Sequence, residues 1–322
     1  MACENPKRIL NRRYSKLGPS GTYEYSLKHF GVPEPPDLYV DVPCGHCFSC
    51  QKSRMNQYRM RLMMECQKWP HNLFVTLSFD DKSLNRFKDS PNKSLKLFFD
   101  RLRKRYKKSY RHWFVAEFGT ENGRLHYHGL IFDTPKNGFP FGEFSRLWSY
   151  GHVWLGWCTP ETVSYIVKYT TKYANGSKRP PRVFCSKGIG DNYLTRSQIM
   201  KHKDLLPKTS FMSVNGRKYP LPRYWFNKIF DDDDKVYLAM KADSLPFSRY
   251  LDGKEYTDER LYKIAREALF DKNVRLGLSY RKDPYKKDPI SFDSFREVQR
   301  DDDYMDYDPF TYDDFSKDIY PF

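Results

Sequence analysis

The spacing of hydrophobic residues predicts helices and strands that alternate along the first half of the chain. At 49–66 the apolar positions recur every three or four residues, as in an amphipathic helix, at Met55, Tyr58, Leu62, Met63 and Cys66. A β-branched and aromatic run, LFVTLSF, follows at 73–79 and favours a buried strand. Helical spacing returns at 94–107, where most of the basic residues lie off the apolar stripe.

Two further runs, WFVAEFG at 113–119 and RLHYHGLIF at 124–132, are predicted strands separated by a turn that contains Asn-Gly. Asn-Gly is a strong hairpin signal, so this pair should be antiparallel. A short strand near 152–155 follows, and then a helix that begins with Thr159 as N-cap and Pro at its first position. The whole pattern predicts an α+β fold, a central antiparallel sheet with helices packed on one face.

These elements define a predicted core at 71–175 with an extension on either side. Residues 1–70 are expected to form an N-terminal arm with a cysteine-rich element and a basic helix. Residues 176–300 are expected to form a partly helical extension that contacts DNA, and residues 301–322 an acidic tail. The clearest helix of the extension is 258–272, with an apolar face made of Leu261, Ile264, Ala265, Ala268 and Leu269.

Charge is distributed unevenly along the chain. Its 322 residues hold 56 Lys and Arg against 40 Asp and Glu, a formal net charge of +16. Residues 301–322 hold eight Asp and one Lys, which leaves +23 on residues 1–300. Such a field attracts polyanions, and 17% aromatic residues suit the stacking of single-stranded bases. Nucleic acid is therefore the predicted partner; the alternative is a basic chain that is only non-specifically adhesive.

Membrane and secretory classes do not fit the sequence. No apolar run approaches the roughly 18 residues that cross a bilayer. The start, MACENPKR, lacks the apolar segment of a secretory signal. An intracellular protein that does not span a membrane is therefore expected.

Three of the seven cysteines crowd into one short stretch, as Cys44, Cys47 and Cys50. An odd total with this spacing argues against a disulfide framework and favours ligands for a soft metal. A ferredoxin-type cluster is disfavoured because Arg54 stands where its next cysteine would be. A structural zinc site and buried free thiols remain as alternatives. Zinc would need a fourth ligand, for which the candidates are Cys3, His46 and Cys66.

A second candidate metal site lies in the predicted hairpin. Alternate residues of a strand share a face, so His126 and His128 should point the same way. Two imidazoles at this spacing can hold a divalent cation if a third ligand is near. Glu117 lies nine residues before His126 and reaches the same face if the hairpin register permits. A pair of solvent-facing histidines is the alternative, because His-x-His is short and occurs by chance.

The predicted helix after residue 159 has a polar face. At about 100° per residue this face carries Tyr165, Lys168, Tyr169 and Lys172. Nearby cations favour a phenolate, and a metal would polarise a phosphate under attack. The alternative is two tyrosines that snorkel on a solvated surface.

These motifs, in this order, resemble those of the HUH superfamily of single-strand endonucleases. His126-Tyr127-His128 matches its His–hydrophobic–His motif, and Tyr165-Ile166-Val167-Lys168-Tyr169 resembles its two-tyrosine motif. Thr76-Leu77-Ser78 is similar to its first motif. Within the superfamily the chain most resembles the rolling-circle replication initiators of microviruses, small single-stranded DNA phages, in their gokushovirus branch. The stretch from Cys44 to Cys50 is similar to a cysteine-rich element of those proteins.

The resemblance implies an HUH, or RRM-like, nuclease core and a metal-dependent, site-specific strand transferase. Mg²⁺ or Mn²⁺ would be held by Glu117, His126 and His128. Tyr165 or Tyr169 would attack the viral origin, leaving a 5′-phosphotyrosyl link and a 3′-OH that primes the host DNA polymerase. The second tyrosine would then rejoin the strand and release circular single-stranded DNA. Lys168 would contact the phosphate or assist proton movement.

Arg124 and Lys172 are the predicted DNA-contacting residues beside these motifs. The sequence has no Walker-type phosphate loop, so a host helicase would unwind the DNA, in the cytoplasm of the host bacterium. One alternative function is a non-catalytic, zinc-stabilised nucleic-acid-binding protein. Another is a metallonuclease that hydrolyses DNA without a covalent step. The first leaves the histidine and tyrosine motifs as coincidences, and the second has no need of the tyrosines.

Overall fold

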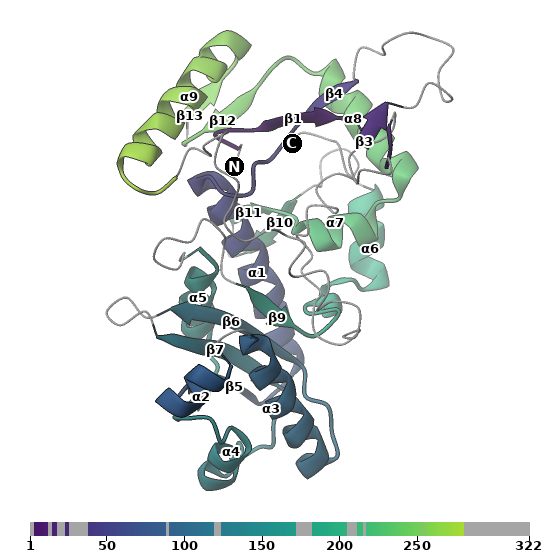
Figure 1. Ribbon diagram of the computed structural model, residues 1–322. Coiled ribbons are helices and arrows are strands. Elements are labelled where there is room, and N and C mark those ends of the chain that lie inside the picture. The colour runs from purple at the N-terminus through teal and green to yellow at the C-terminus, as the bar shows by residue number, and fades with distance from the viewer. Residues whose placement is uncertain are drawn as a thin grey trace.

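A five-stranded antiparallel sheet, in the order β8-β5-β7-β6-β9, forms the centre of the computed structural model (Figure 1). Its strands are β5 (Asn72–Ser78), β6 (His112–Phe118), β7 (Leu125–Phe132), β8 (Val153–Trp157) and β9 (Val183–Cys185). The first four confirm the predicted strands, and β9 adds an edge strand that the sequence did not indicate. The structure describes residues 3–11, 15–17, 23–25, 38–87, 90–118, 124–171, 182–204, 211–214, 217–252 and 254–279.

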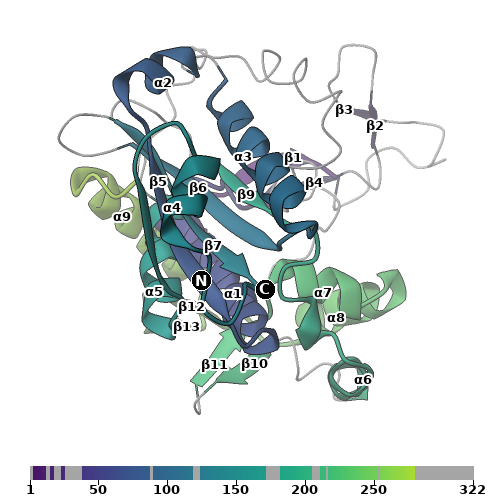
Figure 2. The same cartoon turned by 90° about the horizontal axis from the view of Figure 1, so that it is seen from below.

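Helices cover both faces of this sheet (Figure 2). On one face pack α3 (Pro91–Tyr106) and α4 (Phe141–Leu147), and the short α2 (Asp81–Arg86) follows β5. On the other face pack α1 (Phe48–Lys68) and α5 (Pro160–Ile166), which continues as the 3-10 helix η3 (Val167–Thr171). The α+β class is confirmed, whereas the prediction of helices on one face is corrected. The reason is that the central strands are apolar on both sides and must be covered on both.

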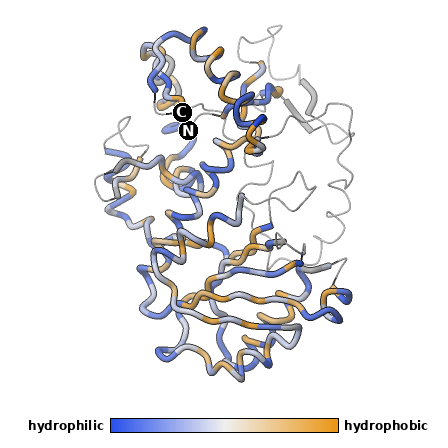
Figure 3. Tube along the Cα trace, turned by 90° about the vertical axis from the view of Figure 1, so that its left-hand side faces the viewer, coloured by the Kyte–Doolittle hydropathy of each residue, from blue (hydrophilic) through white to orange (hydrophobic). Residues whose placement is uncertain are grey.

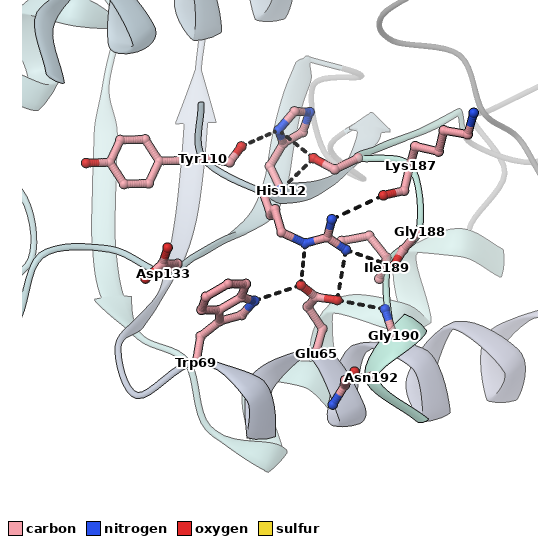
Figure 4. A network of polar contacts seen from close by, with 12 residues as sticks. Glu65, Trp69, Tyr110, His112, Asp133, Lys187, Gly188, Ile189, Gly190 and Asn192 are labelled. Carbon is pink, nitrogen blue, oxygen red and sulfur yellow. Dashed lines mark hydrogen bonds and ion pairs between the residues drawn. The ribbon is translucent and has the colours of Figure 1, made fainter. Parts of the chain in front are cut away.

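A buried charged network holds α1 against the sheet. The carboxylate of Glu65 is 1% exposed and accepts hydrogen bonds from Arg111 Nε at 2.6 Å, Trp69 Nε1 at 2.8 Å and the backbone N–H of Gly190 at 2.7 Å (Figure 4). Burial alone would raise the pKa of Glu65, but the bonds from Arg111, Gly190 and Trp69 outweigh it and lower that pKa. The network therefore joins the helix to the start of β6 and to the loop after β9.

The remaining elements gather around the other end of α1 (Figure 1). Four antiparallel pairs are formed by β1 (Lys7–Leu10) with β4 (Tyr39–Val42), β2 (Ser15–Leu17) with β3 (Tyr23–Tyr25), β10 (Phe211–Val214) with β11 (Arg217–Pro220), and β12 (Arg249–Leu251) with β13 (Lys254–Tyr256). The helices are η4 (Asp191–Tyr193), α6 (Arg196–Asp204), α7 (Arg223–Ile229), α8 (Asp232–Ser244) and α9 (Glu259–Arg275). A separate apolar core here includes Trp225, which stacks on Tyr193 at 4.2 Å, and Met60 of α1.

Hydrophobic residues recur along the sheet and the helices that cover it (Figure 3). Among the described helices, none is both long enough and apolar enough to cross a bilayer. The predicted acidic tail at 301–322 lies outside the described residues.

Candidate active site

Glu117, His126 and His128 meet on the sheet face that carries α1 and α5. The register pairs Glu117 with His126, which is the register needed to bring the carboxylate to the histidines. Nε2 of His126 lies 3.1 Å from Oε2 of Glu117, and Nε2 of His128 lies 2.9 Å from the same oxygen. Glu117 and His128 are buried. The three side chains form a group that could hold a metal ion.

The second nitrogen of each ring fixes how the imidazoles are turned. Nδ1 of His126 lies 3.1 Å from the carbonyl oxygen of Arg124, and because a carbonyl only accepts, this nitrogen carries a proton. In a neutral His126 the lone pair of Nε2 therefore faces the carboxylate of Glu117. Two acceptors in this position need a positive charge, either a further proton or a metal ion. A histidine whose Nδ1–H is held by a protein oxygen is the usual arrangement of a metal ligand, so the donor set fits a divalent cation.

Two neighbouring side chains that support His128 were not singled out from the sequence as site residues. Thr76 is paired with His128 across β5 and β7, and its hydroxyl lies 3.0 Å from Nδ1 of that histidine. The ring of Phe74 stacks on His128 with a centroid distance of 6.0 Å. Strand alternation puts both residues on this face once the register is known, and Thr76 belongs to the stretch that resembles the first HUH motif.

The two tyrosines lie against the same histidine. Helix α5 begins at Pro160 with Thr159 as its cap, as predicted, and tightens into η3 at Val167. The ring of Tyr169 stacks on His128 at 4.3 Å, and the ring of Tyr165 lies edge-on to it at 6.3 Å. The hydroxyl of Tyr169 donates a hydrogen bond to that of Tyr165.

The exposed position predicted for both tyrosines is found for one. Tyr165 is 47% exposed, whereas Tyr169 is 6% exposed and belongs to the core beneath α1. Because the helix tightens at Val167 and the sheet rises to meet it at His128, the second tyrosine turns inward. Burial, the hydrogen bond to Tyr165 and the charge of Glu117 raise the pKa of Tyr169 above its usual range.

The cations predicted near the tyrosines are placed only in part. Lys168 is exposed on η3, between the two tyrosines in the chain. Lys172 lies outside the described residues. Arg124 lies at the start of β7, where its guanidinium donates to the carbonyl of Phe79 and pairs with Asp81 at 2.7 Å. Its predicted DNA contact would require it to leave, or to share, these partners.

An exposed indole that the sequence analysis did not single out lies on the edge strand beside the site. Trp154 is paired with Thr76, so it points to the same face as His128. It is 55% exposed, and its ring lies edge-on to Phe74 at 5.4 Å. A Cβ at Gly156 would collide with this ring, so the glycine leaves the indole room to lie along the strand.

The cysteines form a second group, next to α9. The predicted ligands are joined by Cys3, and the four sulfur atoms lie within 4.8 Å of one another in a group of Cys3, Cys44, Cys47 and Cys50. Cys66, one of the candidates for the fourth position, instead lies 3.3 Å from Cys158.

Comparison with known proteins places the chain in a class. Residues 72–174 match the family model described under the name of the replication-associated protein ORF2. The chain is 26% identical to Replication-associated protein ORF2 of Spiroplasma virus 4, over 87% of this chain and 92% of that protein. It is 27% identical to Replication-associated protein VP4 of Bdellovibrio phage phiMH2K, over 62% and 73%. It is 23% identical to Replication-associated protein A of Enterobacteria phage phiX174, over 66% and 51%. No solved structure matches the chain.

The family match covers strands β5 to β8 of the central sheet, the Glu–His–His group and both tyrosines. The fold, the group and the matches together define a phage replication-associated protein of the ORF2 family. More narrowly, the chain belongs to the replication-associated proteins of microviruses.

Proposed function

We propose that this protein is a metal-dependent endonuclease and strand transferase that nicks and rejoins single-stranded DNA at the viral origin during rolling-circle replication. The observation that carries the proposal is the stacking of Tyr169 on His128 at 4.3 Å, with Tyr165 hydrogen-bonded to Tyr169. A metal group alone would suit any nuclease. Tyrosine hydroxyls beside the candidate metal ligands suit a covalent phosphoryl transfer.

A divalent cation held by Glu117, His126 and His128 would polarise the scissile phosphate. Mg²⁺ and Mn²⁺ are the candidates, and two imidazole ligands favour Mn²⁺ because Mg²⁺ prefers oxygen. The protein's own part is to hold the ligands in place. The carbonyl of Arg124 and the hydroxyl of Thr76 fix the two rings so that both Nε2 atoms point to one place.

In the proposed first step the hydroxyl oxygen of Tyr165 attacks the phosphorus. The tyrosine loses its proton, an oxygen–phosphorus bond forms, the bond to the 3′ oxygen breaks, and that oxygen takes a proton. The products are a 5′-phosphotyrosyl link and a 3′-OH that primes the host DNA polymerase. Tyr165 is the better first nucleophile because it is exposed, whereas burial raises the pKa of Tyr169. Lys168 would contact the phosphate or assist the proton transfers.

In the proposed second step Tyr169 attacks the regenerated junction, and the free 3′-OH then closes the released circle. The hydroxyl–hydroxyl bond suits such alternation, because one tyrosine can donate while the other acts. Trp154 would stack on a base of the bound strand, and Arg124 and Lys172 would contact its backbone. A host helicase would supply the strand, in the cytoplasm of the host bacterium.

The test is a denaturing gel. Full-length protein is incubated with Mn²⁺ and single-stranded oligonucleotides that tile the cognate circular genome, each labelled downstream of the candidate nick. The expected product is a labelled band with the mass of protein plus DNA. It should disappear in the double variant Tyr165→Phe/Tyr169→Phe and persist in Tyr250→Phe, a control that alters an exposed tyrosine outside the site.

The other outcomes select the alternatives. Cleaved DNA without an adduct would indicate a hydrolytic nuclease. Binding without either product, for every oligonucleotide and metal, would indicate a non-catalytic binding protein. Among single variants, Tyr165→Phe should slow the first cleavage more than Tyr169→Phe, and the opposite order would refute the assignment of the first nucleophile.

A further inference from the structure

We infer that Cys3, Cys44, Cys47 and Cys50 bind one Zn²⁺ that joins both ends of the described chain to the first turn of α1. This site is separate from the Glu117–His126–His128 group, and the inference does not depend on the proposed function. Its basis is the geometry of the sulfur atoms, the backbone around them and the segments they join.

The sulfur–sulfur distances fit a single ion. A zinc–sulfur bond of about 2.3 Å gives a tetrahedron whose edge is about 3.8 Å. Sγ of Cys3 lies 3.8 Å from Sγ of Cys47, and no two of the four sulfurs are more than 4.8 Å apart. A four-iron cluster puts each sulfur on a different iron and so spreads them further than one ion does. Thiolates also select zinc over harder cations such as Mg²⁺.

The backbone around the cysteines is arranged to serve the sulfurs. Gly45 has φ +78°, a left-handed conformation that lets the chain turn sharply between Cys44 and Cys47. The N–H of Cys44 donates to Sγ of Cys3 at 3.2 Å, and the N–H of Cys47 donates to Sγ of Cys44 at 3.3 Å. Four thiols that bind Zn²⁺ release four protons and leave two net negative charges. These N–H groups point at the atoms that would carry that charge.

The cluster joins segments that are distant in sequence. Phe270 and Val274 of α9 pack against the cysteines, so the C-terminal helix covers the site. The buried carboxylate of Glu4 accepts from the N–H of Ser49 at 2.9 Å, and the hydroxyl of Ser279 accepts from the N–H of Phe48 at 2.8 Å. Residues from both ends of the described chain thus satisfy the first N–H groups of α1, which have no partner within the helix. Zinc would fasten this junction, in which no disulfide is present and all four cysteines are free.

The test measures the metal content of full-length protein purified under reducing conditions and dialysed against a weak chelator. We expect about one zinc per wild-type chain and almost none in Cys3→Ser. Cys66→Ser is the matched control, because that cysteine is also partly buried and lies outside the cluster, and it should keep its zinc. His126→Ala should keep it too, which separates this site from the candidate active site.

Several results would overturn the inference. These are zinc lost in His126→Ala but kept in Cys3→Ser, iron with acid-labile sulfide, or a metal-free protein whose cluster thiols all react with a thiol reagent or are paired as disulfides. If Cys3→Ser does not fold, the wild-type protein still decides the matter. After removal of its metal, Co²⁺ should give the strong visible absorption of a tetrahedral thiolate site, and its absence would refute the site.

Discussion

Replacing Gly129 by alanine would put a methyl group at the closest approach between β7 and β6. Gly129 is paired with Phe114, and a Cβ there would lie closer than 3.0 Å to three ring carbons of that side chain, a separation real Cβ atoms essentially never show. Phe114 is fully buried and packs edge-on against Phe99 at 5.4 Å, so its ring has little room to move. The crowding should therefore force a shift in the strand that carries His128.

Two opposing effects set the size of the change. Overpacking a well-filled core costs about 1–3 kcal/mol. Alanine also restricts the unfolded chain, which offsets about 0.4–1 kcal/mol at a position whose φ it can adopt, and Gly129 has no positive φ. The net expectation is a loss of about 1–2 kcal/mol in the free energy of unfolding.

Urea unfolding followed by circular dichroism measures this loss, with Gly142→Ala as the matched control. A Cβ at Gly142, on the exposed side of α4, would meet nothing within 4 Å, and alanine favours a helix more than glycine does. This control should be unchanged or slightly more stable. If Gly129→Ala unfolds at the same urea concentration as the wild type, the tight packing of the histidine strand on Phe114 is wrong.

Three further changes probe the rest of the molecule. Burial lowers the pKa of His112 from its usual 6.5 to about 4, so the unfolded chain binds the extra proton first; the wild type should lose about 3 kcal/mol as pH falls from 6.5 to 4, and equilibrium unfolding of His112→Gln should show a shallower loss. Glu65→Gln should cost about 2–4 kcal/mol in urea unfolding, since it leaves Arg111 without its charged partner, and a cost near zero would contradict the network. Trp154→Ala should weaken single-stranded DNA binding by about 1–3 kcal/mol in fluorescence anisotropy, whereas Trp157→Ala, on the opposite sheet face, should not; equal effects would exclude the stacking role.

The strands and the hairpin of the core could be predicted because their signals are local. Alternation placed His126 and His128 on one face, and the Asn-Gly turn gave the antiparallel pairing. The register that brings Glu117 to His126 had to be assumed, since it depends on the exact length of a turn. Trp154 was not singled out at all, because only the pairing of β8 with β5 places it beside the histidines.

Long-range packing explains where the sequence analysis failed. Helical spacing gave both tyrosines an exposed face, but η3 turns Tyr169 into the core. Cys3 lies 41 residues before Cys44, and no spacing rule connects them. The helix predicted at 258–272 is present as α9, yet it buries Tyr262 and Phe270 and leaves Leu261 exposed. Which face of a helix is buried depends on its neighbours, and here they come from the N-terminal arm and the β12–β13 pair.

Helix α1 links the two groups of candidate ligands. Its 21 residues span about 30 Å, with the cysteine group at its first turn and with Tyr58 and Leu62 in the core that includes Tyr169. An unbroken helix transmits position, so whatever fixes the first turn also fixes the extensions relative to the tyrosines. The charge of +23 on residues 1–300 attracts DNA without orienting it. A protein that presents one phosphate to two tyrosines in turn needs flanking surfaces in a constant position, and a zinc-fastened helix end would supply that constancy.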